Sequence, residues 1–421
     1  MPTDADDVQA DRHSFRARWV FPATSAPIEG ATVEITGGQI AAIHTKHDPA
    51  ARDLGNAAII PGLVNAHTHL EFSDLNEPLS PGESFTDWIR SVIDYRHRRT
   101  KPAAEIVTDG LRQSRTSGTT LLGEITTDDE AVDVLGGRQD PSVVSFREII
   151  GLQPEDIDDH CATAQQHLLR EDKHRAGIQV GLSPHAPYSV HPDLFCRLIA
   201  MAKQYRTPVA FHLAETRAEI ELLERGTGPF FNLLNEWGLW REGLFPCRMQ
   251  PLDYLRSLAE TESALVIHGN YLGDDEVRFI AQQPNLTVVY CPRTHAHFGH
   301  ELHPWQRLIE QGANVALGTD GRGSNPDLSL WNELCFLRDR FPSVHPAELL
   351  KLATLNGTRA LRSRLQEIEL LAAGQPADLT ILSLGKATAN DPYTAMFDGS
   401  SRIIATIRDG VPIFTSSDEL T

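Results

Sequence analysis

The sequence of 421 residues lacks the features of several large classes of protein. Its five cysteines are odd in number and scattered, without a Cys-x-x-Cys spacing, so neither a disulfide framework nor a structural zinc knuckle is expected. No apolar run approaches the ~18 residues that a membrane helix needs. The first 14 residues are polar and acidic, unlike the basic start and apolar core of a signal peptide. These absences favour reduced thiols and a cytoplasmic location.

Basic charge is also scarce, because 38 Lys and Arg stand against 57 Asp and Glu, a formal net charge of −19. A protein that binds nucleic acid usually presents a basic face to the phosphates. A hydrophobic content of 41% and a charged content of 23% are typical of a globular protein in water. We therefore expect a globular protein that has neither nucleic acid nor a membrane as its partner.

The pattern of apolar residues changes twice along the chain. Residues 1–14 are predicted to be a disordered tail, and residues 15–58 contain short alternating runs, separated by Gly and Pro, that predict strands. Over residues 59–365, strand candidates alternate with helical stretches whose apolar residues recur every three or four positions. The strand pattern returns over residues 366–421, so both chain ends are expected to pair in one small β-sandwich domain.

The central segment contains eight strand candidates, the number that a (β/α)₈ barrel requires. They are Ile59–Val64, Thr119–Ile125, Ser142–Ile150, Ile178–Leu182, Val209–Leu213, Ala264–His268, Thr287–Tyr290 and Val315–Gly318. The predicted fold class is therefore α/β, a TIM-like barrel inserted in a β-sandwich built from both chain ends. In such a barrel the chemistry lies at the C-terminal ends of the strands.

Two histidines follow the first of these strands, in the sequence Ala66-His67-Thr68-His69. Residues i and i+2 of an extended backbone point to the same side, so His67 and His69 can bind one ion together. Imidazole nitrogens are ligands that zinc prefers. The pair alone is weak evidence in a chain with 18 histidines, and the ends of the later strands carry the further candidates His185, His212, Glu215, His268 and Asp320. Their spacing suits a mononuclear site with an open position for water, its ligands being His67, His69, His212 and Asp320.

The order His-x-His, His-x-x-Glu, His-Gly and Gly-Thr-Asp resembles the amidohydrolase superfamily, in its branch of cytosine-, guanine- and adenosine-type deaminases and chlorotriazine hydrolases. The resemblance covers nearly the whole chain. It implies one divalent metal ion per chain, Zn²⁺ or in some members Fe²⁺, and the hydrolytic removal of ammonia or another leaving group from a ring carbon. Binuclear members use a carbamylated lysine at the fourth strand. Lys173 is the only lysine between Pro141 and Pro192 and precedes that strand, so one metal is expected.

The resemblance also implies roles for three catalytic residues. Asp320, beside a metal-activated water, would take a proton and pass it to the leaving amine. Glu215 would protonate a ring nitrogen, and His268 would contact the nucleophile or polarise the leaving group. Each has a structural alternative: a turn aspartate, a solvated glutamate in the first turn of a helix, and a buried histidine at a strand end.

Three further residues are candidates for binding a small-molecule substrate. His185 resembles the substrate-contacting histidine of nucleoside deaminases, whose motif also reads Pro-His-Ala-Pro-Tyr, although a loop histidine bonded to backbone is the alternative. Arg147 ends the third strand, where related deaminases place an arginine that binds ribose or carboxylate; an ion pair with Glu148 is equally compatible. Trp88 follows the first loop. It is expected either to line the substrate pocket or to be a packing residue of an amphipathic helix.

The segment after Cys291-Pro292-Arg293 departs from the usual pattern, because most relatives continue with Ser-Asn or similar residues. Here the chain carries His295, His297 and His300. They are expected to be specificity residues, with a second metal site as the alternative.

Two stretches, His67–Ser73 and Phe85–Ile93, resemble the aminodeoxyfutalosine deaminases of the alternative menaquinone route. Those enzymes remove the 6-amino group from an adenine that carries a modified ribose. The alternatives are S-adenosylhomocysteine or methylthioadenosine deaminase, guanine deaminase and a chlorotriazine-type hydrolase. A non-catalytic binding relative is a remote alternative, because the whole set of ligands is present. Large barrels of this family often form homodimers, but no segment of the sequence marks an interface.

Overall fold

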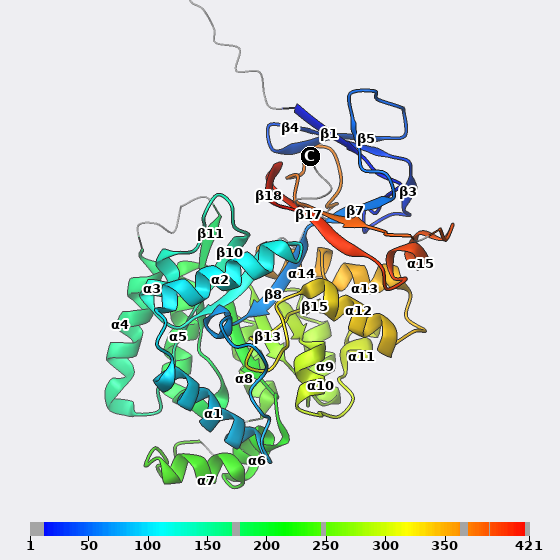
Figure 1. Cartoon of the computed structure of the whole chain (residues 1–421). Helices are drawn as coiled ribbons and strands as arrows, with labels where there is room; N and C mark the ends of the chain where they lie inside the picture. The colour runs from blue at the N-terminus through cyan, green and yellow to red at the C-terminus, as the bar shows by residue number, and fades with distance from the viewer. Residues whose placement is uncertain (1–11, 171–176, 246–249, 363–368, 387, 417–421) are drawn as a thin grey trace, which may run out of the picture. The chain divides into compact units, whose positions relative to one another are not determined.

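The computed structural model describes residues 12–170, 177–245, 250–362, 369–386 and 388–416 (Figure 1). The chain divides into two compact units, one formed by Met1–Leu63 with Glu367–Thr421 and the other by Val64–Gln366. The predicted tail over residues 1–14 is too long, because strand β1 (Arg12–Arg16) already begins at Arg12. The remainder of that predicted tail lies outside the described residues.

The first unit contains two sheets built from both ends of the chain. The four-stranded sheet has the order β5-β4-β1-β6. Besides β1, its strands are β4 (Thr32–Thr36), β5 (Gln39–His44) and β6 (Arg52–Asp53). The six-stranded sheet has the order β18-β17-β16-β7-β2-β3, from β2 (Trp19–Val20), β3 (Ile28–Glu29), β7 (Ala57–Pro61), β16 (Leu379–Ser383), β17 (Arg402–Arg408) and β18 (Val411–Thr415). Val33 and Ile35 of one sheet share a buried core with Ile59 and Ile381 of the other. The predicted β-sandwich from both chain ends is confirmed.

The second unit is an eight-stranded parallel sheet in sequential order from β8 to β15. Its strands are β8 (Leu63–Thr68), β9 (Thr119–Thr126), β10 (Ser142–Glu148), β11 (Ile178–Ser183), β12 (Val209–Leu213), β13 (Ala264–His268), β14 (Leu286–Tyr290) and β15 (Asn314–Leu317). The first and last strands of this sheet, β8 and β15, come together just after β15. There the N–H groups of Thr319 and Asp320 both donate to the carbonyl of His67 in β8, each at 3.1 Å. The barrel fold is therefore confirmed.

The expected first barrel strand, Ile59–Val64, is wrong. Residues 57–61 form β7, which pairs antiparallel with β16 in the first unit, and the barrel begins with β8. The dipeptide Pro61-Gly62, of a kind that marks turns, separates the two strands, and the expected strand runs through it.

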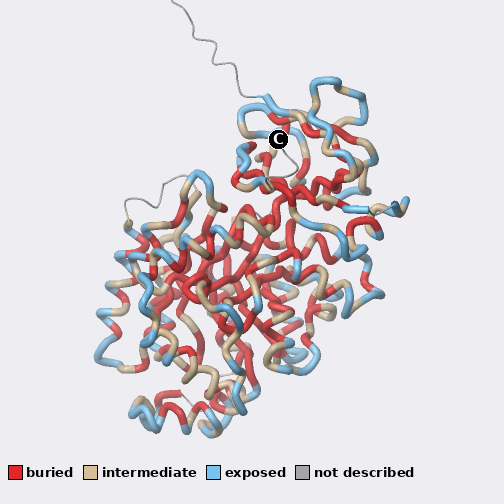
Figure 2. Tube along the Cα trace, viewed as in Figure 1, coloured by how far each residue is buried: buried red, intermediate tan, exposed pale blue. Residues whose placement is uncertain are grey.

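Helices lie around the barrel strands, and buried residues follow the strands between them (Figures 1 and 2). They are α1 (Phe85–Arg98), α2 (Ala103–Thr116), α3 (Asp129–Asp133), α4 (Ile157–Leu168), α5 (Pro192–Tyr205), α6 (Arg217–Arg225), α7 (Pro229–Glu236), α8 (Pro251–Leu258), α9 (Asp274–Ala281), α10 (Pro292–His297), α11 (Trp305–Glu310), α12 (Leu330–Arg340), α13 (Pro346–Leu352) and α14 (Leu355–Arg362), with α15 (Pro392–Met396) in the first unit. Val64, Phe146, Leu265 and Val289 contribute to a core inside the barrel. Within the described part of the chain, no helix has the length and apolar character needed to span a membrane.

Candidate active site

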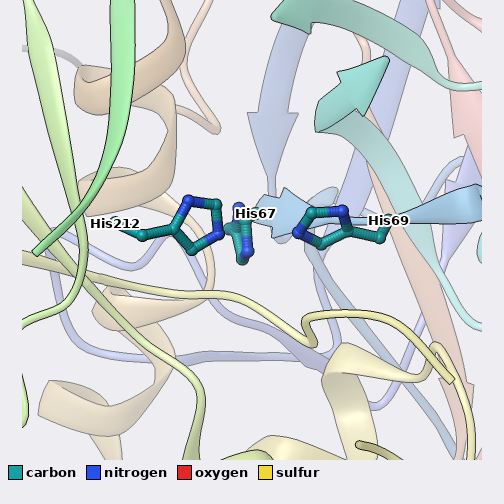
Figure 3. Close-up of side chains that lie close together, drawn as sticks. All are labelled: His67, His69 and His212. Atoms are coloured by element: carbon teal, nitrogen blue, oxygen red, sulfur yellow. The ribbon is translucent and has the colours of Figure 1, made fainter. Parts of the chain in front are cut away.

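Three buried histidines meet at the C-terminal ends of the barrel strands (Figure 3). His67 lies in β8, His69 follows it on extended backbone, and His212 lies in β12. One ring nitrogen from each lies within 4.8 Å of the other two, and this is the one such His, Cys, Asp or Glu cluster among the residues described. The i, i+2 spacing therefore does place His67 and His69 on one side, as the sequence predicts.

The nitrogens of these histidines are left available for a metal ion. Both nitrogens of His67 and Nδ1 of His69 are buried without a hydrogen-bond partner among the described residues. His212 Nδ1 donates to the carbonyl of His185 at 3.0 Å, so its Nε2 is the nitrogen left for an ion. Burial lowers the pKa of His67 and His69 well below the usual value and lowers that of His212 to about 4. The rings are therefore neutral, the form in which imidazole binds metals.

A carboxylate completes the donor set. Asp320 Oδ1 lies 3.5 Å from Nε2 of His67 and 3.7 Å from Nε2 of His69. Its other oxygen, Oδ2, accepts a hydrogen bond of 2.7 Å from the hydroxyl of Ser324. Burial raises the pKa of Asp320, but His69, His268 and the Ser324 hydroxyl lower it by more, so the group is ionised. Three neutral imidazoles and one carboxylate fit a single divalent ion such as Zn²⁺.

Glu215 and His268 form a second pair next to this donor set. His268 Nε2 lies 3.2 Å from Glu215 Oε1, and the hydroxyl of Tyr188 donates to Glu215 Oε2 at 3.4 Å. Burial, followed by the charges of Asp320 and Glu219, raises the pKa of Glu215 well above its usual value. A carboxyl group whose pKa is raised in this way keeps its proton to higher pH, which suits a general acid.

The backbone is strained at or just after the C-terminal ends of the strands that carry the site residues. Ala214, His268 and Asp320 have φ angles of 53°, 66° and 56°, in the left-handed region that residues other than glycine rarely adopt. Each follows or ends a barrel strand, at β12, β13 and β15. Strain of this kind persists only when surrounding contacts impose it, and it concentrates at functional sites.

A cavity of about 400 Å³ opens beside these groups. Its polar lining includes His69, Arg96, Glu148, His185, Tyr188, His212, Glu215, His268 and Asp320. Its apolar wall comes mainly from α1, with Phe85, Trp88, Ile89, Val92 and Ile93, and from α7 and the residue after it, with Phe230, Leu233, Leu234 and Trp237. The structure therefore brings the predicted Trp88 and His185 to one pocket with the predicted catalytic residues.

Arg147, in contrast, does not line this cavity, whereas the next residue, Glu148, does. Successive side chains of a strand point to opposite faces, so only one of the two can face the barrel mouth. The alternative, a structural ion pair of Arg147 with Glu148, is not found among the described residues: Nε and Nη1 of Arg147 are buried without a hydrogen-bond partner. The arginine that lines the cavity is Arg96 of α1. Arg96 donates to both oxygens of Glu71, at 2.6 and 3.2 Å, and lies 3.7 Å from Glu148 Oε2.

Arg96 and Glu148 are not among the predicted site residues, although both carry a readable signal. Arg96 lies eight residues after Trp88 on the same helix, with Val92 midway, so a spacing of four places all three on one face. Glu148 is the last residue of β10, where a barrel presents its chemistry.

The histidines after β14 do not lie where the sequence analysis expects specificity residues. His295 Nδ1 donates to Asn270 Oδ1 at 3.1 Å, His297 Nε2 donates to the carbonyl of Leu79 at 3.0 Å, and the His300 ring bonds to the hydroxyl of Tyr271. None of the three lines the cavity, and their nitrogens do not gather as a metal cluster among the described residues. Both expectations for these histidines are wrong.

Comparison with known proteins assigns the family. The profile of the Amidohydrolase family matches residues 58–413. The chain belongs to the amidohydrolase family. An aminodeoxyfutalosine deaminase of Deinococcus radiodurans is 29% identical over 337 residues, covering 76% of this chain and 78% of the relative.

Two further proteins support the family and the fold. A 5-methylthioadenosine/S-adenosylhomocysteine deaminase of Pyrococcus furiosus is 28% identical over 350 residues, covering 79% of this chain and 76% of the relative. The crystal structure of an adenosine deaminase from Xanthomonas campestris with bound zinc matches with a TM-score of 0.77 at 24% identity, covering 97% of this chain and 94% of that one. This amidohydrolase is thus a hydrolase of carbon–nitrogen bonds whose relatives are deaminases.

Proposed function

We propose that this amidohydrolase deaminates the adenine ring of a 5′-modified adenosine, with aminodeoxyfutalosine as the first candidate substrate. The observation that carries the proposal is the Glu215–His268 pair, 3.2 Å apart, beside three buried histidines that fit one metal ion. The resemblance to the Deinococcus aminodeoxyfutalosine deaminase supports the choice of substrate. Turnover of that compound would place the protein in menaquinone biosynthesis, and we propose a cytoplasmic location for it.

The metal we propose is Zn²⁺, with Fe²⁺ as the alternative, held by His67, His69, His212 and Asp320. Neutral imidazoles and a carboxylate are a donor set that zinc accepts, and the Xanthomonas structure contains zinc. When bound, such an ion supplies a water whose pKa is lowered toward neutrality.

The protein's own groups would manage the protons of the reaction. Glu215, whose pKa is raised by burial, would donate a proton to a ring nitrogen, which makes the adjacent carbon accept the water oxygen. Asp320, kept ionised, would take a proton from that water and pass it to the leaving amine. His268, whose Nε2 lies 3.2 Å from Glu215 Oε1, would contact the nucleophile or polarise the leaving group. As the amine leaves and the carbonyl forms, the second proton of the water would return to Glu215, so the overall change replaces the amino group by oxygen and releases one ammonia.

The cavity suits a nucleoside in size and in lining. About 400 Å³ lies within the range of pockets that bind small molecules. We propose that Trp88 and the neighbouring residues of α1 and α7 cover the apolar parts of the substrate. His185, whose Nδ1 bonds to Ser189 Oγ at 2.6 Å, keeps Nε2 for the substrate, 3.9 Å from Glu148. Arg147 is left out of the proposed contacts because it does not line the cavity.

A second candidate reaction is the deamination of methylthioadenosine or S-adenosylhomocysteine. It is favoured by the Pyrococcus deaminase, which matches at 28% identity, close to the 29% of the Deinococcus enzyme. The apolar wall from α1 and α7 would accept a thioether tail as well as an aromatic one.

A substrate panel tests the proposal. The zinc-loaded protein would be offered aminodeoxyfutalosine, methylthioadenosine, S-adenosylhomocysteine, adenosine, guanine, cytosine and a chlorotriazine, with ammonia or chloride release as the signal. We expect selective release of ammonia from one of the 5′-modified adenosines. Activity on another ring alone would overturn the adenine assignment. Inactivity on the whole panel would favour a non-catalytic binding protein.

A further inference from the structure

We propose that Glu219 and His303 are positioning residues, which hold the backbone of Glu215 and His268 so that the two side chains meet. The inference rests on the proposed deamination, in which Glu215 and His268 act together. It concerns residues that do not line the cavity and therefore do not touch substrate. It also gives a role to His295 and His303, two buried histidines after β14 that do not line the cavity.

Glu219 holds the strained turn that follows β12. It lies in the first turn of α6 and is completely buried. Its Oε1 accepts the N–H of Ala214 at 2.8 Å and its Oε2 accepts the N–H of Glu215 at 2.9 Å. Each carboxylate oxygen thus binds one of two successive amides, and the first belongs to a residue with a φ of 53°. This pairing fixes the direction in which the Glu215 side chain leaves the backbone.

His303 holds the end of the next strand, β13. Its Nε2 donates to the carbonyl of His268 at 2.7 Å, and its ring stacks on Tyr290 with 4.0 Å between centroids. The ring is buried, with 3% of its surface exposed, so water does not compete for this bond. Because the bond is made to the carbonyl of a residue whose φ is 66°, it stabilises the conformation that points the imidazole at Glu215.

A third contact ties the two strand ends together. Asn270 Nδ2 donates to the carbonyl of Glu215 at 3.0 Å, and its Oδ1 accepts a bond from His295 Nδ1 at 3.1 Å. His303 therefore bonds directly to the backbone of His268, and His295 bonds to Asn270, which in turn bonds to the backbone of Glu215. The supporting residues are buried, and a displacement of about 1 Å at a catalytic group can cost about 100-fold in rate.

The test compares three variants of the full-length, zinc-loaded enzyme. His303→Leu removes the donor to His268, and His303→Gln keeps an N–H at similar reach. His167→Leu is the matched control, because His167 is also buried and also bonds to a strand carbonyl, that of Ser145 at 3.1 Å. Steady-state kcat and KM, zinc content and the melting temperature are measured for each.

We expect His303→Leu to lower kcat by at least ~10-fold while KM and zinc content stay within about twofold, because the apolar wall from α1 and α7 and the metal ligands are unchanged. His303→Gln should restore most of kcat, and His167→Leu should change only the melting temperature. A wild-type kcat in His303→Leu would overturn the proposal. So would failure of His303→Gln to restore the rate, or an equal loss of kcat in the control.

Glu219→Gln gives an independent measurement at the other turn. The amide can accept only one of the two N–H groups and presents a donor to the other. A fall in kcat at unchanged KM is expected, and an unchanged kcat would remove Glu219 from the proposal. Failure of the proposed function would appear instead as inactivity of the wild-type enzyme on the adenosine panel, and the variants would then be compared on whichever substrate the wild type turns over.

Discussion

Replacement of Glu215 by glutamine tests the general acid with little change of shape. Gln is nearly isosteric with a protonated glutamate and can still bond to His268 and Tyr188, but it has no proton to transfer. Loss of general acid–base catalysis costs about 10²- to 10⁴-fold, or roughly 3–5 kcal/mol of transition-state stabilisation. We therefore expect kcat to fall by at least ~100-fold while zinc content and KM stay near their wild-type values.

The pH profile of the same variant provides the second half of the prediction. Burial raises the pKa of Glu215, so the protonated, active form is present below that raised pKa and is lost as the pH rises through it. The kcat/KM of the wild type should therefore decline on the alkaline side, and the residual activity of Glu215→Gln should lack that decline. Ammonia release measured across a pH series gives both curves. A variant that keeps most of its activity, or that loses its zinc, would refute the assigned role.

Four further changes test the metal site and the pocket. His67→Ala should abolish zinc binding, measured as metal per chain after dialysis, and full occupancy would show that the ligand set is wrong. Gly318→Ala should weaken zinc binding, because the added Cβ would lie 2.9 Å from both the Cβ and the carbonyl oxygen of His67; an unchanged metal affinity would show that His67 can shift freely. Ser324→Ala removes the hydrogen bond that lowers the pKa of Asp320, so the acidic limb of kcat/KM should move to higher pH, and an unmoved limb contradicts this role. Trp88→Ala should raise KM by about 10- to 100-fold with little change in kcat, since burying an aromatic group contributes ~1.5–3 kcal/mol, and an unchanged KM would place Trp88 outside the substrate site.

Periodicity and strand-end residues were enough to predict the barrel and the residues that meet at its mouth. His67, His69, His212 and Asp320 come together because a parallel barrel brings the C-terminal ends of all its strands to one edge. That consequence of topology needs no knowledge of side-chain packing. The same rule could have named Glu148, the last residue of β10.

What the sequence could not specify depended on which face of an element points inward. Arg147 and its neighbour Glu148 differ only in strand face, whereas the boundary between β7 and β8 carried a readable signal in Pro61-Gly62. The histidines after β14 are a similar case, because only the three-dimensional arrangement shows that His303 bonds to the carbonyl of His268. A count of histidines in the sequence does not distinguish a ligand from a support.

The most direct test of the central claim is to follow oxygen and nitrogen together in one turnover. The zinc-loaded enzyme would convert a 5′-modified adenosine in water enriched in oxygen-18. The mass of the product would be measured by mass spectrometry, and the ammonia released would be quantified in the same reaction. The account predicts a hypoxanthine product with one solvent oxygen on the ring and one ammonia released per product. A product that retains the amino group, or ammonia released without incorporation of solvent oxygen, would contradict it.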